Sequence, residues 1–483
     1  MTTTRPRTGL PASPDGEPGD LAGSTPTPTP TPADVPAATD AAPAYDPKRA
    51  RRALLGAWLG FFVDLFDIYL PIVVLAPAMD YFVSDDMGTS TVAIVSGAMF
   101  AATLIGRPIG AAIFGWIADT MGRKRTTMLA MTGAGAVTLL IACLPGYQQL
   151  GMASVVLFVL LRLLAGVFLG GEYTGANPLA MEAAPPHKRG LYSGIINTGF
   201  PLAYATVSII TLFLLLGMSS DGPDSTYAQW GWRVPFIIGA LLSFGSVVYF
   251  YKSVEESEVF ETAVQDSGTA KRSPLRELME RDNMIRLIQV FVLMNGFWLS
   301  LQPVAASLPL LLGKDGVGMS SRTVTVILVV AYLSLACVEI AAAVFSQRIG
   351  RRRFLIGSAI IMAIAGTLLF LIVVRTDNLA ISIIVSIALV IVVIAPWAVL
   401  PAYINERFPT SVRASGYGLA YSLAVIIPSF YAFYQAGLEH IMPFNDTGAV
   451  LLVIGALLIL FGATWGPETK HVDLETAEPS EKS

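Results

Sequence analysis

Twelve apolar stretches, each long enough to cross a lipid bilayer, constrain this chain more than any other feature of its sequence. A membrane-spanning helix needs about 20 mostly apolar residues. Inside a bilayer such a segment must satisfy its own backbone hydrogen bonds, and a helix does so. The predicted spans are 53–79, 90–117, 126–144, 153–183, 191–217, 231–251, 285–312, 322–346, 354–374, 379–405, 414–438 and 447–466. We therefore expect an all-α membrane protein with twelve transmembrane helices.

The composition excludes most other classes of protein. Hydrophobic residues make up 54% of the 483 residues and charged residues only 14%, whereas a soluble chain carries about 25% charge. An ordinary soluble enzyme and a disordered protein are excluded, and the net charge of −4 argues against a nucleic-acid binder. Cys143 and Cys337 lie in apolar runs, which predicts small unpaired core residues rather than a disulfide.

Residues 1–50 differ in composition from the rest of the chain. The stretch STPTPTPTPADVP is rich in Pro and Thr and has no apolar period, so we expect a disordered tail and no signal peptide.

Lys and Arg are concentrated in alternate loops, namely 48–52, 123–125, 188–189, 272–286, 348–353 and 407–413. The positive-inside rule makes these loops cytoplasmic. It predicts a multi-pass protein of the plasma (inner) membrane with both termini in the cytoplasm.

The chain divides into two halves of six spans. A charged cytoplasmic linker, residues 252–284, separates an N-terminal bundle at 51–251 from a C-terminal bundle at 285–466, and 467–483 form a cytoplasmic tail. Two loops repeat between the halves. GWIADTMGRKR after span two matches AVFSQRIGRRR after span eight, 228 residues on, and EAAPPHKRGLYSG after span four matches ERFPTSVRASGYG after span ten, 224 residues on. A parallel repeat of this kind predicts a mid-membrane substrate site between the halves.

The loop after span two resembles the signature of the major facilitator superfamily. Its residues here are Gly115, Asp119, Gly122, Arg123 and Arg125, with Thr120 where the family usually has Arg or Lys. Further strings, RPIGAAIFG, RLLAGVFLGGEYTGA, WGWRVPFIIG and PETKHVDLE, resemble the metabolite:proton symporters, which are close to the sugar porters. The resemblance covers about residues 50–470. It implies a major facilitator fold of two pseudo-symmetric halves and a transporter that works by alternating access.

The loop charges predict a cytoplasmic gate. A carboxylate beside a tight turn can pair with arginines or cap a helix N-terminus, and we expect Glu182 to pair with Arg189 and Glu406 with Arg413. Such contacts would hold the cytoplasmic side shut while the protein faces outward. The alternative is positive charge that only sets topology. The predicted gate consists of Asp119, Arg123, Arg125, Glu182, Arg189, Glu406 and Arg413.

Charges inside the spans are candidates for proton coupling. Each costs about 2.5–3.5 kcal/mol to insert and usually has a role. Asp64 and Asp67 lie one turn apart on span one and repel each other, so we expect one of them, Asp67 in preference to Asp64, to bind the coupled proton. Arg162 and Glu172 on span four complete the proton-coupling set. The alternative is a structural pair satisfied by Arg107 or Arg162.

The predicted substrate site combines one cation with neutral groups. Arg107 lies deep in span two, about 18 Å along the helix from Asp119, and its planar fork suits a substrate carboxylate. Asn295, Trp298 and Gln302 on span seven offer hydrogen bonds and an aromatic wall. Further candidates to line the cavity are the aromatic residues Tyr332, Trp397, Tyr403, Tyr421, Tyr431 and Tyr434. Glu339 on span eight is a further intramembrane charge without a recognisable partner.

These observations predict proton-coupled import of a small polar metabolite, an organic acid, by a monomer that contacts substrate, protons and lipid but no nucleic acid. The alternatives are an uncoupled or efflux transporter, a non-transporting sensor on the same fold, and a zwitterionic, neutral or aromatic-acid substrate. No Walker A string occurs, and the three histidines are scattered, so neither ATP-driven transport nor a metal or cofactor site is expected.

Overall fold

The computed structural model describes residues 47–83, 89–121, 123–171, 173–220, 222–253, 277–313, 316–409 and 412–472. All of them belong to one compact unit that begins at Tyr45. Most of the predicted tail and most of the predicted linker therefore lie outside the described residues. The boundaries shift slightly, because the first helix already begins at Pro47 and the seventh span begins at Arg281.

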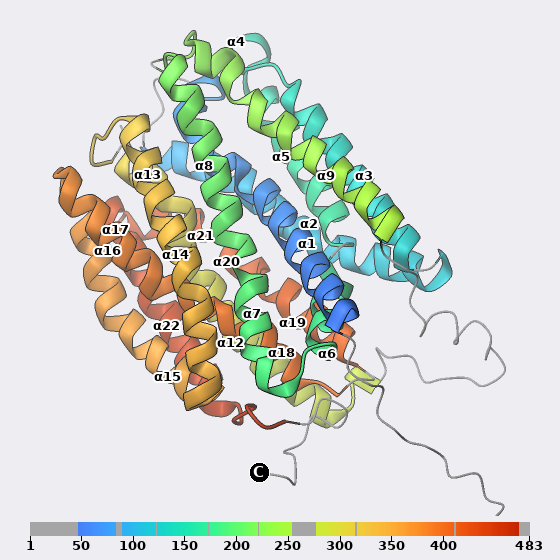
Figure 1. Ribbon diagram of the computed structural model, residues 1–483. Helices are drawn as coiled ribbons and strands as arrows, with labels where there is room; N and C mark the ends of the chain where they lie inside the picture. The colour runs from blue at the N-terminus through green and yellow to red at the C-terminus, as the bar shows by residue number, and fades with distance from the viewer. Residues whose placement is uncertain are drawn as a thin grey trace, which may run out of the picture. The chain divides into compact units, whose positions relative to one another are not determined.

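The first six spans are built from helices that are continuous or broken once (Figure 1). They are α1 (Pro47–Val73), η1 (Ala76–Tyr81), α2 (Thr89–Met121), α3 (Arg123–Ala142), α4 (Tyr147–Leu150), α5 (Met152–Leu169), α6 (Tyr173–Glu182), η2 (Pro186–Lys188), α7 (Arg189–Asn197), α8 (Gly199–Gly217), η3 (Tyr227–Gly231) and α9 (Arg233–Ser253).

The last six spans contain more breaks, several of them at proline. Their helices are α12 (Arg281–Gln302), η4 (Pro303–Ser307), α13 (Leu308–Leu312), α14 (Ser321–Ile349), α15 (Arg351–Ile361), η5 (Met362–Gly366), α16 (Thr367–Val373), α17 (Leu379–Ile394), η6 (Ala395–Val399), α18 (Leu400–Arg407), α19 (Arg413–Ala424), α20 (Ile426–Ser429), α21 (Tyr431–Leu438), η7 (Phe444–Asp446) and α22 (Thr447–Trp465).

The prediction of an all-α fold with twelve spans is confirmed. Among the described residues, 12 helices are long and apolar enough to cross a membrane, and each predicted span overlaps one of them. Large apolar side chains such as Phe213 and Ile384 are 69% and 67% exposed on the outside of the bundle, as a lipid-facing surface requires. The prediction of core cysteines is wrong, because Cys143 and Cys337 are both exposed.

The two halves repeat in their packing as well as in their loops. The second span packs on the fourth in the first half (α2 on α5), and the eighth packs on the tenth in the second (α14 on α17). The fourth span breaks where α5 ends at Leu169, and the tenth breaks where α17 ends at Ile394, 225 residues later. The halves meet where α7 and α8 lie beside α14 and where α2 contacts α20 and α21 (Figure 1).

Candidate functional site

A close crossing of α2 and α5 brings the two intramembrane arginines next to α1. A Cβ atom at Gly166 would lie 2.0 Å from the carbonyl oxygen of Thr103, and one at Gly170 would lie 2.2 Å from that of Arg107. Only glycine permits backbones to approach so closely, which is how small residues serve helix packing in membranes. Gly166 and Gly170 thus fix the position of Arg107 against the helix that carries Arg162.

Asp67 on α1 is held by three hydrogen bonds. Arg162 donates from Nη1 to Asp67 Oδ2 at 2.9 Å and from Nη2 to the Asp67 backbone oxygen at 2.9 Å. Thr138 on α3 donates from Oγ1 to Asp67 Oδ1 at 2.6 Å. Both carboxylate oxygens therefore have a partner, and this buried ion pair ties α1 to α3 and α5.

Only one of the two carboxylate oxygens of Asp64, on α1, accepts a hydrogen bond from a described residue. Arg107 donates from Nη2 to Asp64 Oδ2, and both residues are 3% exposed. Asp64 Oδ1 is buried and has no hydrogen-bond partner among the described residues. The first half thus contains two buried ion pairs, Asp67–Arg162 and Asp64–Arg107. The Asp64–Arg107 pair is held by fewer of the described hydrogen bonds. Glu172, the remaining predicted coupling residue, lies outside the described residues.

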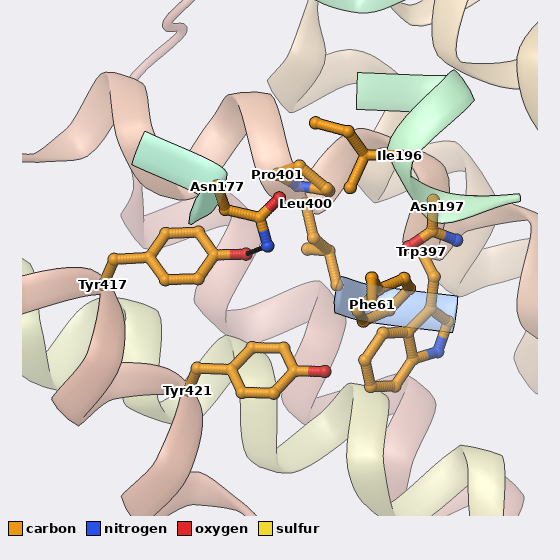
Figure 2. Close-up of a pocket in the computed structure, with 9 residues that line it drawn as sticks. All are labelled: Phe61, Asn177, Ile196, Asn197, Trp397, Leu400, Pro401, Tyr417 and Tyr421. Carbon is orange, nitrogen blue, oxygen red and sulfur yellow. Dashed lines mark hydrogen bonds between the residues drawn. The ribbon is translucent and has the colours of Figure 1, made fainter. Parts of the chain in front are cut away.

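A small cavity lies between the two halves (Figure 2). The space open to the centre of a water molecule is about 10 Å³, which suits about one water, so this cavity is too small to hold a metabolite. The first half contributes Phe61, Asn177, Ile196 and Asn197, and the second contributes Trp397, Leu400, Pro401, Tyr417 and Tyr421. The broken tenth span supplies part of this wall through η6 and α18, as expected of a discontinuous helix at a transport site.

The predicted substrate residues of α12 are buried beside this cavity but do not line it. Trp298 packs edge-on against two residues that do, with ring centroids 5.0 Å from Trp397 and 5.4 Å from Tyr421. Several of their polar atoms have no hydrogen-bond partner among the described residues: Trp298 Nε1, Asn295 Oδ1, and both side-chain polar atoms of Gln302. Such unpaired buried groups are costly, and a polar ligand could satisfy them. Arg107, the predicted cation of the site, is not among the residues that line the cavity.

Sequence reasoning missed the polar residues of the cavity wall on the side of the first half. Asn177 donates from Nδ2 to Tyr417 Oη at 3.3 Å, across the interface between the halves. Asn197 donates from Nδ2 to Glu339 Oε1 at 2.7 Å, also across this interface, and so provides the partner that the sequence did not reveal for Glu339. The available signal was that each Asn interrupts an otherwise apolar span.

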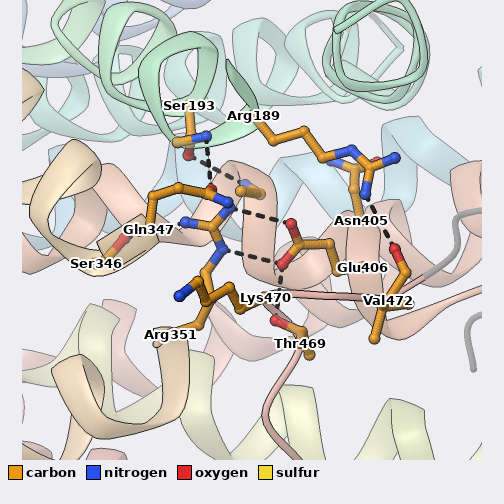
Figure 3. A network of polar contacts seen from close by, with 12 residues as sticks. Arg189, Ser193, Ser346, Gln347, Arg351, Asn405, Glu406, Thr469, Lys470 and Val472 are labelled. Atoms are coloured by element: carbon orange, nitrogen blue, oxygen red, sulfur yellow. Dashed lines mark hydrogen bonds and ion pairs between the residues drawn. The ribbon is translucent and has the colours of Figure 1, made fainter. Parts of the chain in front are cut away.

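The predicted gate lies at the end of the bundle that holds the α6–α7, α14–α15 and α18–α19 connections, which we call the basic end. Glu406 there pairs with Arg351 rather than with Arg413: Arg351 donates from Nε at 3.0 Å and from Nη2 at 3.1 Å (Figure 3). Both residues are fully buried. Thr469 donates to the same carboxylate at 2.7 Å, so residues 467–472 pack against the predicted gate residues rather than forming a free tail.

The second ion pair among the predicted gate residues joins the two halves. Arg413 pairs through Nη1 with Glu182 of the first half, where the sequence suggested partners within each loop. Arg189 donates from Nη1 to the Val472 backbone oxygen at 3.1 Å. The reason is tertiary, because the repeated loops of the two halves face each other across the interface. The Arg125 side chain is exposed, and those of Asp119 and Arg123 lie outside what the structure describes.

Comparison with known proteins identifies the kind of protein to which this site belongs. The model of the Major Facilitator Superfamily matches residues 57–432. The chain is 29% identical over 446 residues to the inner membrane metabolite transport protein YhjE of Escherichia coli K12, covering 89% of this chain and 97% of that protein. It is 30% identical over 422 residues to the shikimate transporter of E. coli K12, covering 85% and 93%.

The fold is also that of a solved transporter. The structure matches the proton:xylose symporter XylE of E. coli with a TM-score of 0.69 and 18% identity, covering 90% of this chain and 99% of that chain.

Proposed function

The chain belongs to the Major Facilitator Superfamily and is a membrane transporter rather than an enzyme, and we propose that it imports a small organic acid together with a proton. The proposal places the protein in the inner membrane with its basic end toward the cytoplasm, as the distribution of Lys and Arg favours. A relative named for shikimate, which is a carboxylate, supports an acidic substrate.

The observation that carries the proposal is the buried ion pair between Asp64 and Arg107 in the first half. A proton on Asp64 neutralises that carboxylate and removes the counter-charge that Asp64 provides to the Arg107 guanidinium. Weakening the pairing of a buried charge is unfavourable, and the carboxylate of a substrate restores it with the geometry that an arginine guanidinium prefers. Proton and anion therefore bind together better than either binds alone.

Asp64 is the better coupling residue of the two aspartates. Its Oδ1 atom accepts no hydrogen bond from any residue that the structure describes, so a proton can be added there without breaking one of the described contacts. A proton on Asp67 would disturb hydrogen bonds from Arg162 and Thr138. This reverses the preference for Asp67 that the sequence suggested, and it assigns the Asp67 pair to holding α1, α3 and α5 together.

A zwitterion is the second candidate substrate, and the aromatic rings beside the cavity favour it. Trp298 stands edge to face against both Trp397 and Tyr421, and aromatic faces bind quaternary ammonium groups. A betaine-like molecule would place its carboxylate at Arg107 and its cation against these rings.

The test is proton movement in proteoliposomes suspended in weak buffer. We expect pooled organic acids to cause protein-dependent alkalinisation outside the vesicles, and pooled zwitterions to cause less. Alkalinisation with the zwitterion pool alone would show that the substrate is a zwitterion rather than an organic acid. Uptake of labelled acid without any proton movement would overturn symport.

Variants of Asp64 test the coupling residue. Asp64→Asn is expected to abolish proton movement, whereas Asp446→Asn, the same change in the exposed ion pair with Arg375, is expected to leave it unchanged. Asp64→Glu keeps the carboxylate and should retain coupling, which separates loss of the titrating group from loss of folding. Normal proton movement in Asp64→Asn would exclude Asp64 as the proton carrier.

A further inference from the structure

Glu339 is a buried carboxylate at the interface between the two halves. It lies on α14, it is 0% exposed, and its Oε2 atom has no hydrogen-bond partner within the part of the chain that the structure describes. Its Oε1 atom accepts a hydrogen bond from Asn197 Nδ2 at 2.7 Å. Asn197 belongs to α7 of the first half and also lines the central cavity, so this contact links the cavity to the interface.

Among the described residues, no cation pairs with Glu339 from the elements packed against α14. On α7 the charged residue is Arg189, eight residues and about 12 Å along the helix from Asn197, where it donates to a backbone oxygen. On α15, Arg351 is already paired with Glu406. On α8 the titratable residue is Tyr204, and α13, α17 and η6 contain no ionisable side chain.

The remaining ionisable side chains near Glu339 along α14 point elsewhere or lie far along the helix. Cys337 is exposed on the outside of the bundle. Tyr332 lies about two turns away and stacks on Tyr204 at 3.7 Å between ring centroids. Arg348 lies nine residues on and is exposed at the basic end.

The helices on which Glu339 and Asn197 lie are in close contact. A Cβ atom at Gly194 on α7 would lie 2.9 Å from Ala343 Cβ and 3.0 Å from Ile340 Cα on α14. At the next turn, Gly190 donates its backbone N–H to Gln347 Oε1 at 3.2 Å. Glu339 is therefore buried in a close contact between the halves, which is lost when the halves separate at the basic end.

We propose that Glu339 is a second proton-binding site, distinct from Asp64. Glu339 is protonated while the basic end is closed, and it releases its proton when the halves separate there. In the closed conformation a charged carboxylate would be buried with one amide donor and no cation, which a single hydrogen bond does not offset. Opening exposes the carboxyl group to water, where it ionises and transfers its proton to a water molecule. Ionised Glu339 then resists closure until it is protonated again.

This inference rests on the proposed function for its direction, because release toward the cytoplasm requires the basic end to face that side. It deepens the proposed function, since it makes closure of the gate itself dependent on a bound proton. Its core claim concerns a conformational equilibrium and needs no substrate, so it can be tested apart from transport.

The test measures the distance between spin labels at His187 and Arg348, which are exposed on opposite halves at the basic end, by pulsed electron resonance. Cys143→Ala and Cys337→Ala provide a background without native cysteines. In reconstituted protein without substrate, we expect the population with a long distance to rise about fivefold or more as the pH is raised from acid to alkaline.

Three variants decide the result. Glu339→Gln, which mimics the protonated acid, is expected to stay closed at every pH, whereas Glu339→Asp keeps a titrating group and should retain the pH response. Glu439→Gln, the same change at an exposed glutamate, should behave as the parent. A normal pH response in Glu339→Gln would overturn the inference.

Asp64→Asn separates the two proposals. If this variant loses the pH-dependent opening while Glu339→Gln keeps it, the switch belongs to Asp64, and the inference fails while the proposed function stands. If Glu339→Gln abolishes opening and Asp64→Asn still moves protons with substrate, the inference stands and the role of Asp64 fails.

Discussion

At the scale of single residues, Arg107, Arg162 and Arg351 organise this protein because each forms a buried ion pair with a carboxylate. Arg351 is the fullest example: it donates two hydrogen bonds to Glu406, one to Ser346 Oγ at 3.1 Å and one to Gln347 Oε1 at 2.6 Å. Removing one member of such a pair leaves an uncompensated buried charge, which is worse than losing the whole pair.

Arg351→Ala should therefore destabilise the closed protein by about 3–5 kcal/mol. Thermal unfolding of the purified protein in detergent measures this as a lower midpoint. Arg353→Ala, two residues away at an exposed position, is the matched control and should change little. Equal midpoints for the two variants would contradict a stabilising role of the Arg351–Glu406 pair.

The two aspartates of α1 should respond differently to the same substitution. At position 64 an asparagine can turn its N–H group toward the unpaired side and keep its oxygen on Arg107. At position 67 both oxygens accept hydrogen bonds, so an amide loses one of them. Asp67→Asn should then be less stable than Asp64→Asn by about 1–3 kcal/mol, measured by thermal unfolding. The reverse order would show that Asp64 is the structural member of the two.

At the scale of elements, glycine contacts and helix breaks position the site. The crossing of α2 and α5 depends on backbones in direct contact, and the breaks in the fourth and tenth spans recur at equivalent places in the two halves. Irregular backbone within a membrane is tolerated where it is buried or lines a cavity, and the break at η6 does both.

Gly166→Ala should disrupt the α2–α5 crossing. The new methyl group would lie 2.0 Å from the Thr103 carbonyl oxygen, so the helices must separate, at a cost of at least about 1–3 kcal/mol. Size-exclusion chromatography and thermal unfolding should show a loss of folded protein. Gly357→Ala on α15, where nothing lies within 4 Å, should be neutral, and similar behaviour of both variants would contradict the close approach.

At the scale of the whole molecule, the closed conformation is a balance of contacts between two halves. The contacts between the halves include the Glu182–Arg413 pair at the basic end, the Asn197–Glu339 hydrogen bond beside the cavity and the packing of Gly194 on α14. The Glu182 side chain is 39% exposed, and an ion pair with this much solvent contact contributes about 1 kcal/mol or less.

Glu182→Gln should thus raise the population that is open at the basic end by no more than about fivefold. The same spin-label pair at His187 and Arg348 measures the change. The charge exchange Glu182→Arg with Arg413→Glu should restore much of the closed population, because it rebuilds the pair in reverse. No change in Glu182→Gln would show that the pair does not contribute to closure.

The sequence by itself determined the number of spans, their limits to within a few residues and the family, because bilayer thickness and backbone satisfaction act on each segment separately. It also singled out Asp64, Asp67, Arg107 and Arg162 as intramembrane charges. It did not distinguish the core from the lipid-facing surface, since both are apolar, and Cys143 and Cys337 were misplaced for that reason.

Only the tertiary structure decided which charged side chains pair with one another. Arg413 meets Glu182 across 231 residues, and Asn197 meets Glu339 across 142. These contacts depend on how the two halves face each other, and no local pattern encodes that arrangement. The same arrangement decides that Asp67 is fully satisfied while Asp64 is not, because hydrogen-bond partners are assigned by packing in three dimensions rather than by spacing along a helix.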